Sequence, residues 1–254
     1  MAGAKVFLKF DMKSGFWKIG IKEEDRHKTA FVVPHGHYEW NVMPFGLKNA
    51  PSEFQNRMDE VYKSISGFCL IYIDDALIFS NSEEEHAEHL SQFKDLTYKH
   101  GLALSEPKMQ IGLDEVDFLG LHIKQGFIIP QPHIAEKISQ FPDQLSTRKQ
   151  IQQFLGIINY AADCVQNLSK MTSQISKHLK KGAPQWSEEV TKAVMVLKQK
   201  CKSLPPLKIP DNGQLILQTD ASNHYWGALL IEESEVNRKV CGYKSGQFND
   251  AQSH

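Results

Sequence analysis

The sequence predicts an α+β fold in three parts. Short runs rich in Ile, Leu, Phe and Tyr, bounded by turn signals, indicate buried strands, and capped amphipathic stripes indicate helices between them. The pattern changes at about Gly126, where helices predominate, and again at the linker Leu204-Pro205-Pro206, after which strands return. These changes predict an α+β domain at residues 1–125, a helical module at 126–206 and the start of a third domain at 207–254.

The first predicted elements are a strand, a hairpin and a helix. Residues 6–10 are an apolar strand, and residues 29–42 are a hairpin whose loop is Pro34-His35-Gly36-His37. A helix follows Asn49, because Pro51 suits the first turn of a helix. The apolar stripe of this helix consists of Phe54, Met58, Val61, Tyr62 and Ile65.

A second hairpin and a second helix come next. The apolar runs 68–73 and 76–79 are separated by two acidic residues and predict paired strands. Ser82 and Glu85 have the spacing of a capping box, which starts a helix that ends near Gly101. The apolar face of this helix contains Leu90, Phe93 and Leu96.

The rest of the chain predicts one more strand of the first domain, then helices, then strands. Residues 116–123 form the strand. Thr147 with Gln150, and Ser187, are suitable N-terminal caps for helices in the module. The predicted helices span 147–160, 169–181 and 187–203, and the predicted later strands span 215–219, 226–231 and 239–243.

Composition indicates an intracellular globular protein. The chain has 254 residues, 41% hydrophobic and 23% charged, and no apolar run approaches the length of a membrane span. Its four cysteines form no Cys-x-x-Cys pair, which argues against a zinc knuckle or a disulfide scaffold. The net charge of −1 hides a basic segment at 147–204, with ten Lys and Arg against three acids. Such a segment favours a polyanionic partner, although a lysine-rich solvated surface would look the same.

Asp74 and Asp75 are the most informative residues. They lie between two apolar strands, so the Asp pair is expected to occupy a tight turn, where Asn-Gly or Asp-Gly would be the usual choice. Two neighbouring anions beside a core are unfavourable unless a cation neutralises them, and Mg²⁺ prefers carboxylate oxygens. A solvated loop tip with two acids is the equally weighted alternative.

Asp11 supplies a third carboxylate at the end of an apolar strand. If its strand neighbours the strand next to Asp74 and Asp75, the three acids meet and could hold two metal ions. Two metals in such a site support in-line phosphoryl transfer, because one activates the attacking oxygen and the other stabilises the leaving oxygen.

Five stretches, in family order and at family spacing, resemble motifs of the reverse transcriptases of LTR retroelements. The resemblance is closest to plant pararetroviruses (caulimovirus-like) and gypsy-type elements, and it runs nearly end to end. The stretches are Asp11 to Phe16, Thr29 to Met58, Tyr72-Ile73-Asp74-Asp75, Gly101 to Lys108 and Phe118-Leu119-Gly120. Thr219-Asp220-Ala221-Ser222 also resembles the opening of a ribonuclease H domain. The resemblance implies a palm with an antiparallel sheet and packed helices (with partial fingers), a helical thumb and a partial ribonuclease H-like α/β segment.

The resemblance implies roles in catalysis for five residues. Asp11 and Asp74 would bind the metals, with Asp75 in support, for nucleotidyl transfer from a dNTP to a primer 3′-hydroxyl. Lys108 would neutralise or protonate the departing pyrophosphate, the alternative being an exposed surface lysine. Asp220 would bind metal in the ribonuclease H site, the alternative being an ordinary turn acid. Mg²⁺ is the implied cofactor, with Mn²⁺ as a substitute.

Other residues are implied in binding the nucleotide and the primer. Phe16 would exclude the 2′-hydroxyl of a ribonucleotide, the less favoured alternative being a core phenylalanine beside the turn at Gly15. Phe45 and Gly46 would lie against the incoming nucleotide, together with Tyr72. Phe118, Leu119 and Gly120 would form a primer grip, and core packing is the alternative for the first two.

The implied partners are an RNA or DNA template–primer, dNTPs and the remainder of a polyprotein, with no membrane. The expected location is the cytoplasm or a virus-like particle, with the nucleus as a further option and no secretion. Only ten residues precede Asp11, and the chain ends at Ser253-His254. The isolated chain is therefore expected to extend a primer poorly. The alternative function is a catalytically inactive, nucleic-acid-binding remnant of an integrated element.

His86 and His89 have a helical spacing that could present both rings to one metal ion. Because Glu84, Glu85 and Glu88 surround them, a solvated helix face is the favoured interpretation.

Overall fold

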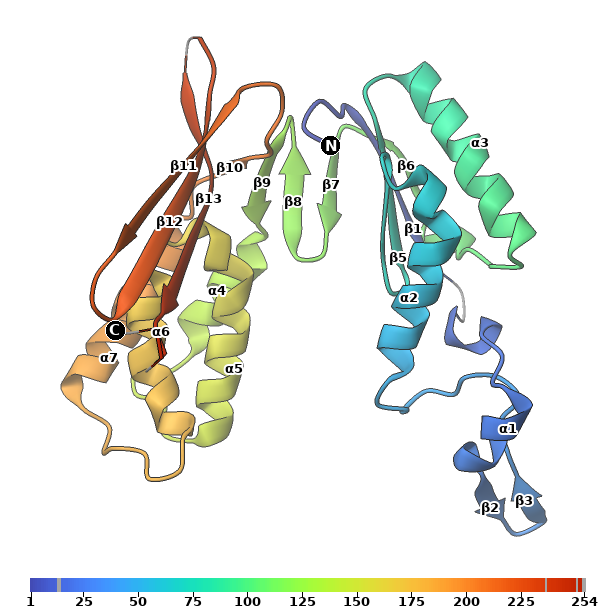
Figure 1. Ribbon diagram of the computed structural model, residues 1–254, viewed down its shortest axis with the longest axis horizontal. Coiled ribbons are helices and arrows are strands. Elements are labelled where there is room, and N and C mark those ends of the chain that lie inside the picture. The colour runs from blue at the N-terminus through green and yellow to red at the C-terminus, as the bar shows by residue number, and fades with distance from the viewer. Residues whose placement is uncertain (13–14, 236, 250, 253–254) are drawn as a thin grey trace. The chain divides into compact units, whose positions relative to one another are not determined.

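The computed structural model describes residues 1–12, 15–235, 237–249 and 251–252. Lys13 and Ser14 of the first motif, and the C-terminal Ser253 and His254, lie outside the described residues. Residues 3–116 and 117–254 form two compact units (Figure 1). The predicted α+β class is confirmed, whereas the predicted boundaries at 125 and 206 stay predictions.

The first unit is built on a four-stranded antiparallel sheet. The strand order is β4 (Cys69–Tyr72), β5 (Asp75–Ser80), β1 (Val6–Asp11) and β6 (Gln110–Leu113). Two helices, α2 (Ala50–Tyr62) and α3 (Glu83–Lys99), pack against it through one hydrophobic core. Tyr62 of α2 stacks on Phe93 of α3 at 5.1 Å, and Phe93 stacks on Phe10 of β1 at 5.2 Å.

A small hairpin with a short helix before it projects from the first unit. The helix is α1 (Glu23–Arg26), and the strands are β2 (Phe31–Val33) and β3 (Gly36–Tyr38). The hairpin is shorter than predicted, and its turn is Pro34-His35 with Gly36 already paired to Val33. The pairing ends at Phe31 and Tyr38, and beyond it the Trp40 N–H donates to Thr29 Oγ1.

The second unit begins with a sheet where one strand was predicted. Its order is β10 (Leu207–Lys208), β9 (Phe127–Pro130), β8 (Leu121–Lys124) and β7 (Glu115–Phe118), of which Asp117 and Phe118 belong to this unit. The predicted single strand at 116–123 is wrong, because two successive residues with positive φ, Leu119 at 50° and Gly120 at 80°, turn the chain back. Strand β9 was not predicted, since prolines obscured its pattern.

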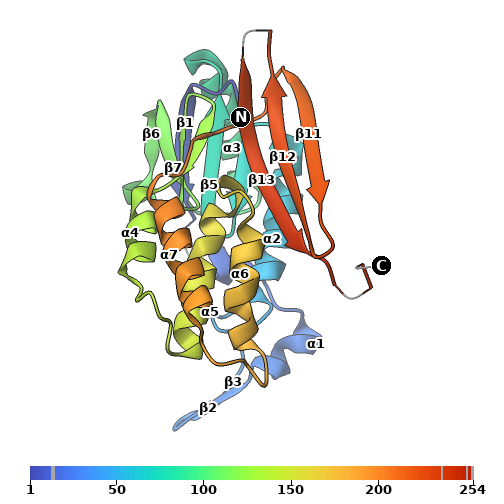
Figure 2. The same cartoon turned by 90° about the vertical axis from the view of Figure 1, so that its left-hand side faces the viewer.

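Four helices and a three-stranded sheet complete the second unit (Figure 2). The helices are α4 (Pro132–Gln140), α5 (Arg148–Ile158), α6 (Leu168–Ser176) and α7 (Glu188–Lys202), and they share one hydrophobic core. The antiparallel strands are β11 (Gln214–Ala221), β12 (Tyr225–Glu233) and β13 (Arg238–Gln247). Helix α4 was missed, because Pro132 marks its first turn and not a break.

Helix caps confirm several predicted starts. Thr147 and Gln150 form a complete capping box on α5, and Ser187 Oγ accepts from the Val190 N–H on α7. Ser82 Oγ accepts from the Glu85 N–H on α3, but Glu85 reaches back to the Asn81 N–H and not to residue 82. Among the helices of the described ranges, none has both the length and the apolar character needed to cross a membrane.

Candidate functional site

The sheet of the first unit brings the three predicted carboxylates together. Strand β1 pairs with β5 so that Asp11 lies directly opposite Asp75. In addition, the Met12 N–H donates to the Asp74 carbonyl oxygen at 2.7 Å. Residues directly opposite on antiparallel strands project to the same face of the sheet. Asp11 therefore lies beside the Asp74–Asp75 pair, as expected.

The turn between β4 and β5 differs from the prediction. Tyr72 pairs with Asp75, so the turn residues are Ile73 and Asp74, and Asp75 already belongs to β5. Ile73 has a φ of 53°, a conformation that a β-branched side chain rarely adopts and that costs about 1–3 kcal/mol. The expectation that the Asp pair fills the turn is wrong, because the register places Asp74 in the turn and Asp75 in strand β5.

Asp74 lies in an environment that disfavours its charge. Burial, followed by the neighbouring charges of Asp11 and Asp75, raises the pKa of the Asp74 carboxyl above its ordinary value. Asp74 Oδ1 is buried and has no hydrogen-bond partner. Buried carboxylate oxygens without partners are costly in a finished fold and typical of a site that binds a ligand or ion.

Gly15 permits this close packing. A Cβ atom at residue 15 would lie 2.7 Å from Asp74 Oδ1 and 2.6 Å from Cζ of the Phe54 ring. The sequence indicated Gly15 only as a turn residue. The structure shows that a side chain at this position would displace the carboxylate or the ring.

Two lysines balance part of the negative charge. Lys108 Nζ donates to Asp11 Oδ2, and this bond, with the charge of Asp11, raises the pKa of Lys108. Lys9 Nζ lies 3.8 Å from Asp75 Oδ1. As they stand, no three His, Cys, Asp or Glu side chains of the described ranges converge on one point where an ion could sit. The hard oxygen donors and the unpartnered Asp74 Oδ1 nevertheless fit a divalent cation.

The predicted nucleotide-binding residues are mostly aromatic and differ in exposure. Phe16 is 8% exposed, and its ring lies 5.3 Å from Phe45 and 5.0 Å from Phe54. Phe45 is 63% exposed, and Gly46 beside it has a φ of 93° with open space where a Cβ would be. Tyr72 is 52% exposed. Phe16 thus contacts both the core, as its plain alternative required, and an exposed ring of the predicted nucleotide-binding set.

The predicted primer-grip residues belong to the second unit. Phe118 is buried, and Leu119 is exposed at the tip of the β7–β8 turn. A Cβ at Gly120 would lie 3.1 Å from the ring of Tyr160, which follows α5. The turn is therefore fixed by its own backbone and by the helical part of its unit.

Asp220 lies near the end of β11, opposite Gly227 of β12. It is exposed, and its Oδ1 accepts from the Ala221 N–H. The residue lines an open pocket of about 630 Å³ together with Lys170, Tyr225 and Trp226.

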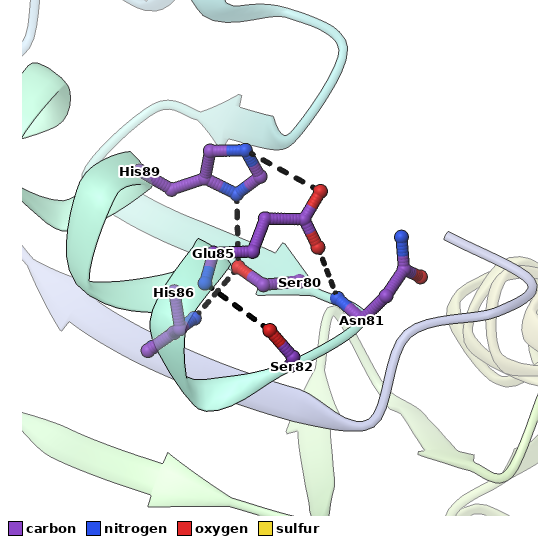
Figure 3. Close-up of polar contacts among 6 residues, drawn as sticks. All are labelled: Ser80, Asn81, Ser82, Glu85, His86 and His89. Carbon is purple, nitrogen blue, oxygen red and sulfur yellow. Dashed lines mark hydrogen bonds and ion pairs between the residues drawn. The ribbon is translucent and has the colours of Figure 1, made fainter.

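The interpretation of His86 and His89 as a solvated helix face is wrong for His86, which is 6% exposed. Both rings contact Ser80 (Figure 3). Ser80 Oγ lies 2.8 Å from His86 Nδ1 and 2.9 Å from His89 Nδ1. His89 also stacks on Phe68, with ring centroids 3.6 Å apart. The two rings fix α3 to the end of β5, and glutamates on the outer face of α3 misled the prediction.

Gln55 is a residue that sequence reasoning missed. Its side-chain amide bonds to the backbone of the β4–β5 hairpin at Ile71 in β4 and at Ile73 in the turn. Its position next to Phe54 on a helix carried no signal, because only the tertiary fold brings α2 beside the hairpin.

Family models and known proteins match most of this chain. The family described as "Reverse transcriptase (RNA-dependent DNA polymerase)" matches residues 1–123, and "RNase H-like domain found in reverse transcriptase" matches residues 186–254. The chain is 44% identical, over 98% of its length, to the enzymatic polyprotein of Cauliflower mosaic virus (strain NY8153). It is also 44% identical, over 100% of its length, to the genome polyprotein of Petunia vein clearing virus (isolate Shepherd).

The fold has solved counterparts as well. A structure of the foamy viral protease-reverse transcriptase in complex with RNA/DNA hybrid matches 98% of this chain and 34% of that chain, with a TM-score of 0.80 and 23% identity. The chain spans 38% of the Cauliflower mosaic virus polyprotein and 12% of the Petunia vein clearing virus polyprotein. The chain thus belongs to the reverse transcriptase family, with a reverse transcriptase domain at residues 1–123 and an RNase H-like segment at residues 186–254.

Proposed function

We propose that the carboxylate cluster of the first unit catalyses nucleotidyl transfer from a dNTP to a primer 3′-hydroxyl on an RNA or DNA template. The observation that supports this best is the register of β1 and β5, which sets Asp11 opposite Asp75 beside the turn that holds Asp74. A cluster of acids with a buried, unpartnered oxygen suits the binding of cations at a phosphate-transfer centre.

Reverse transcriptases are in general dependent on divalent metal, and we assign Mg²⁺ to this chain, with Mn²⁺ as a substitute. Asp11 and Asp74 would hold the ions, with Asp75 in support. When bound, the ions stabilise the charges of the attacking and leaving oxygens. The raised pKa of Asp74 supports this assignment, because a cation would offset both the burial and the repulsion from Asp11 and Asp75 that raise it.

The chain's own side chains would position the substrate. Lys108 carries a proton beside Asp11 and is exposed, so it can turn to the triphosphate and neutralise the departing pyrophosphate. Phe45, Gly46 and Tyr72 offer an exposed aromatic and glycine surface to the nucleotide, and Phe16 would limit the space at the sugar.

The second unit would hold the template–primer. Its helices carry most of the basic segment, and nine of the ten basic residues there are exposed, the tenth being Lys198. Contacts of this kind are made to phosphates and depend on salt more than on sequence. Phe118, Leu119 and Gly120 would contact the primer strand. The foamy viral relative is described in complex with RNA/DNA hybrid, which supports the same partner for this chain.

Asp220 would be one metal ligand of a ribonuclease H site. Its place near the end of a strand, at an open pocket, supports the assignment. The remaining acids of such a site would come from polyprotein sequence that follows Asp220, so we expect RNA cleavage only when that sequence is present.

Primer extension with Mg²⁺ tests the polymerase assignment. The sample is the chain and a longer polyprotein segment that contains it, each on RNA and DNA templates. We expect Asp74→Asn to reduce synthesis by the longer segment by about 10³-fold, because a neutral amide binds a divalent metal ion far more weakly than a carboxylate does. Asp95→Asn, an exposed change on α3, is the matched control and should leave synthesis unchanged.

Undiminished synthesis by Asp74→Asn would contradict the assignment. If wild-type protein binds template–primer in a salt-sensitive way but incorporates no nucleotide, the second candidate, a non-catalytic nucleic-acid-binding protein, is the better description.

A further inference from the structure

The side chain of Gln55 links helix α2 to the turn that carries Asp74. Gln55 Oε1 accepts from the Ile73 N–H at 2.7 Å. Gln55 Nε2 donates to the Ile71 carbonyl oxygen at 3.0 Å. One amide therefore satisfies a backbone donor in the turn and a backbone acceptor two residues before it.

The Ile73 N–H needs such a partner. Ile73 is the first turn residue, and its φ of 53° lies in the left-handed region that a β-branched residue avoids. The pairing of Tyr72 with Asp75 closes the hairpin without using the Ile73 N–H. A strained conformation persists only where surrounding contacts determine it, and Gln55 supplies the contact at this residue.

Asp59 determines which way the amide points. Its Oδ1 accepts from Gln55 Nε2 at 2.8 Å, one turn further along α2. An ionised carboxylate accepts hydrogen bonds and cannot donate them. The contact therefore holds the NH₂ group of Gln55 on the Asp59 side and leaves the amide oxygen toward Ile73. Both donors and the acceptor of the Gln55 amide are then used.

The clamp has rigid supports on both sides of the turn. Phe54 and Met58 of α2 are fully buried in the core, which fixes the helix that carries Gln55. On the opposite side, the Asp74 carbonyl oxygen accepts from the Met12 N–H of the segment that follows β1. The backbone of Ile73 and Asp74 is thus held between α2 and β1.

We propose that Gln55, oriented by Asp59, is a positioning residue that holds the Ile73–Asp74 turn so that the Asp74 carboxylate stays beside Asp11 and Asp75. The hydrogen bonds of Gln55 to the hairpin go to backbone groups, so Gln55 acts through Asp74. The consequence for nucleotide incorporation rests on the proposed function, whereas the clamp itself does not.

Amide hydrogen exchange of Ile73 in the metal-free 254-residue chain tests the clamp directly. We expect Gln55→Met to speed exchange of this amide by about tenfold or more, because the side-chain acceptor that Gln55 provides is lost. Asn56→Met, an exposed change on the same helix, should leave exchange at the wild-type rate. Amides within β1 and β5 serve as internal controls for an intact fold.

A paired substitution provides a rescue. In Gln55→Glu with Asp59→Asn, the acceptor at Ile73 is kept and the donor and acceptor between residues 55 and 59 are exchanged, but the donor to the Ile71 carbonyl oxygen is lost. We expect this double variant to restore part of the protection that Gln55→Met loses. Gln55→Glu alone places two carboxylates together and should restore less.

Mn²⁺ alone reports whether the clamp reaches the carboxylates. We expect paramagnetic broadening to show about tenfold weaker Mn²⁺ binding in Gln55→Met, as for other groups that orient metal ligands. In a segment that synthesises DNA, kcat of Gln55→Met should fall with KM for dNTP unchanged.

Wild-type exchange at Ile73 in a folded Gln55→Met protein would overturn the clamp. Fast exchange with wild-type Mn²⁺ affinity would overturn its role in positioning. Failure of Asp74→Asn to stop synthesis would refute the polymerase function but leave the exchange result intact.

Discussion

At the scale of single residues, Asp74 is held where its charge is unfavourable to the metal-free fold. Because its pKa is raised in the folded state, the folded protein binds a proton there more tightly than the unfolded chain does. This residue therefore lowers stability at neutral pH, and its contribution improves as pH falls through its folded pKa. We expect Asp74→Asn to raise the thermal midpoint of the metal-free chain by about 2 °C, measured by calorimetry at pH 7. A lower midpoint at pH 7 would show that the carboxylate is stabilising, contrary to the geometry.

Phe16 combines packing with a place in the proposed nucleotide site, and a variant pair can separate the two. Phe16→Ala should increase ribonucleotide incorporation relative to deoxyribonucleotide by about 10–200-fold, since the gain comes from removed steric exclusion. It should also cost about 3 kcal/mol of stability, because Phe16 is buried against Phe54. Phe54→Ala is the matched control, with a similar loss of stability and unchanged sugar selection. Primer extension with competing nucleotides measures sugar selection in the two variants, and thermal unfolding measures their stability. Equal sugar selection in the two variants would refute the gate.

At the scale of elements, α3 is joined to β5 through a buried histidine whose charge the fold disfavours. Burial, followed by the charge of His89, lowers the pKa of His86, and Ser80 is the polar partner of both rings. Glu85, 3.8 Å from His89 Nε2, is the acidic group that faces this pair. Because the unfolded chain protonates His86 at a higher pH than the folded protein does, stability is lost as pH falls through the ordinary histidine pKa.

We expect the midpoint of thermal unfolding of the first unit to fall by about 2–4 °C between pH 7 and pH 5. His86→Asn, whose amide can still reach Ser80, should flatten this dependence, whereas His100→Asn on an exposed position should not. Circular dichroism melts across this pH range provide the measurement. Parallel curves for wild type and His86→Asn would rule out His86 as the source.

At the scale of the whole molecule, the features that the sequence predicted depend on local contacts, and those that it missed depend on the surrounding structure. Helix starts at Thr147 and Ser187 were predictable, because caps are local contacts. The meeting of Asp11 with Asp75 was predictable as a condition on strand pairing. The turns at Ile73 and Leu119 were not, because both adopt a positive φ that their side chains disfavour and that only surrounding structure imposes.

The remaining misses have the same origin. Gln55 and His86 act through partners that are distant in sequence or hidden on the inner side of a helix. The glutamates of α3 correctly predicted a solvated outer face, but they carried no information about the inner face. Local pattern therefore predicted elements, while the resemblance to reverse transcriptases supplied the site, and side-chain contacts across the fold required the structure.

The basic helices of the second unit should determine the salt dependence of template–primer binding. Lys198 is committed to the fold, because its Nζ donates to the Phe141 carbonyl oxygen and to Asp143, each at 2.6 Å. Lys180 and Lys181 are exposed in the segment after α6. Replacing both with Gln should reduce the slope of log K against log salt by about 2 for a duplex, because two phosphate contacts are lost. Lys94→Gln on α3 is the control, and fluorescence anisotropy at several salt concentrations gives the slopes. An unchanged slope in the double variant would place the nucleic acid elsewhere, since screening by salt acts only on contacts that are actually made.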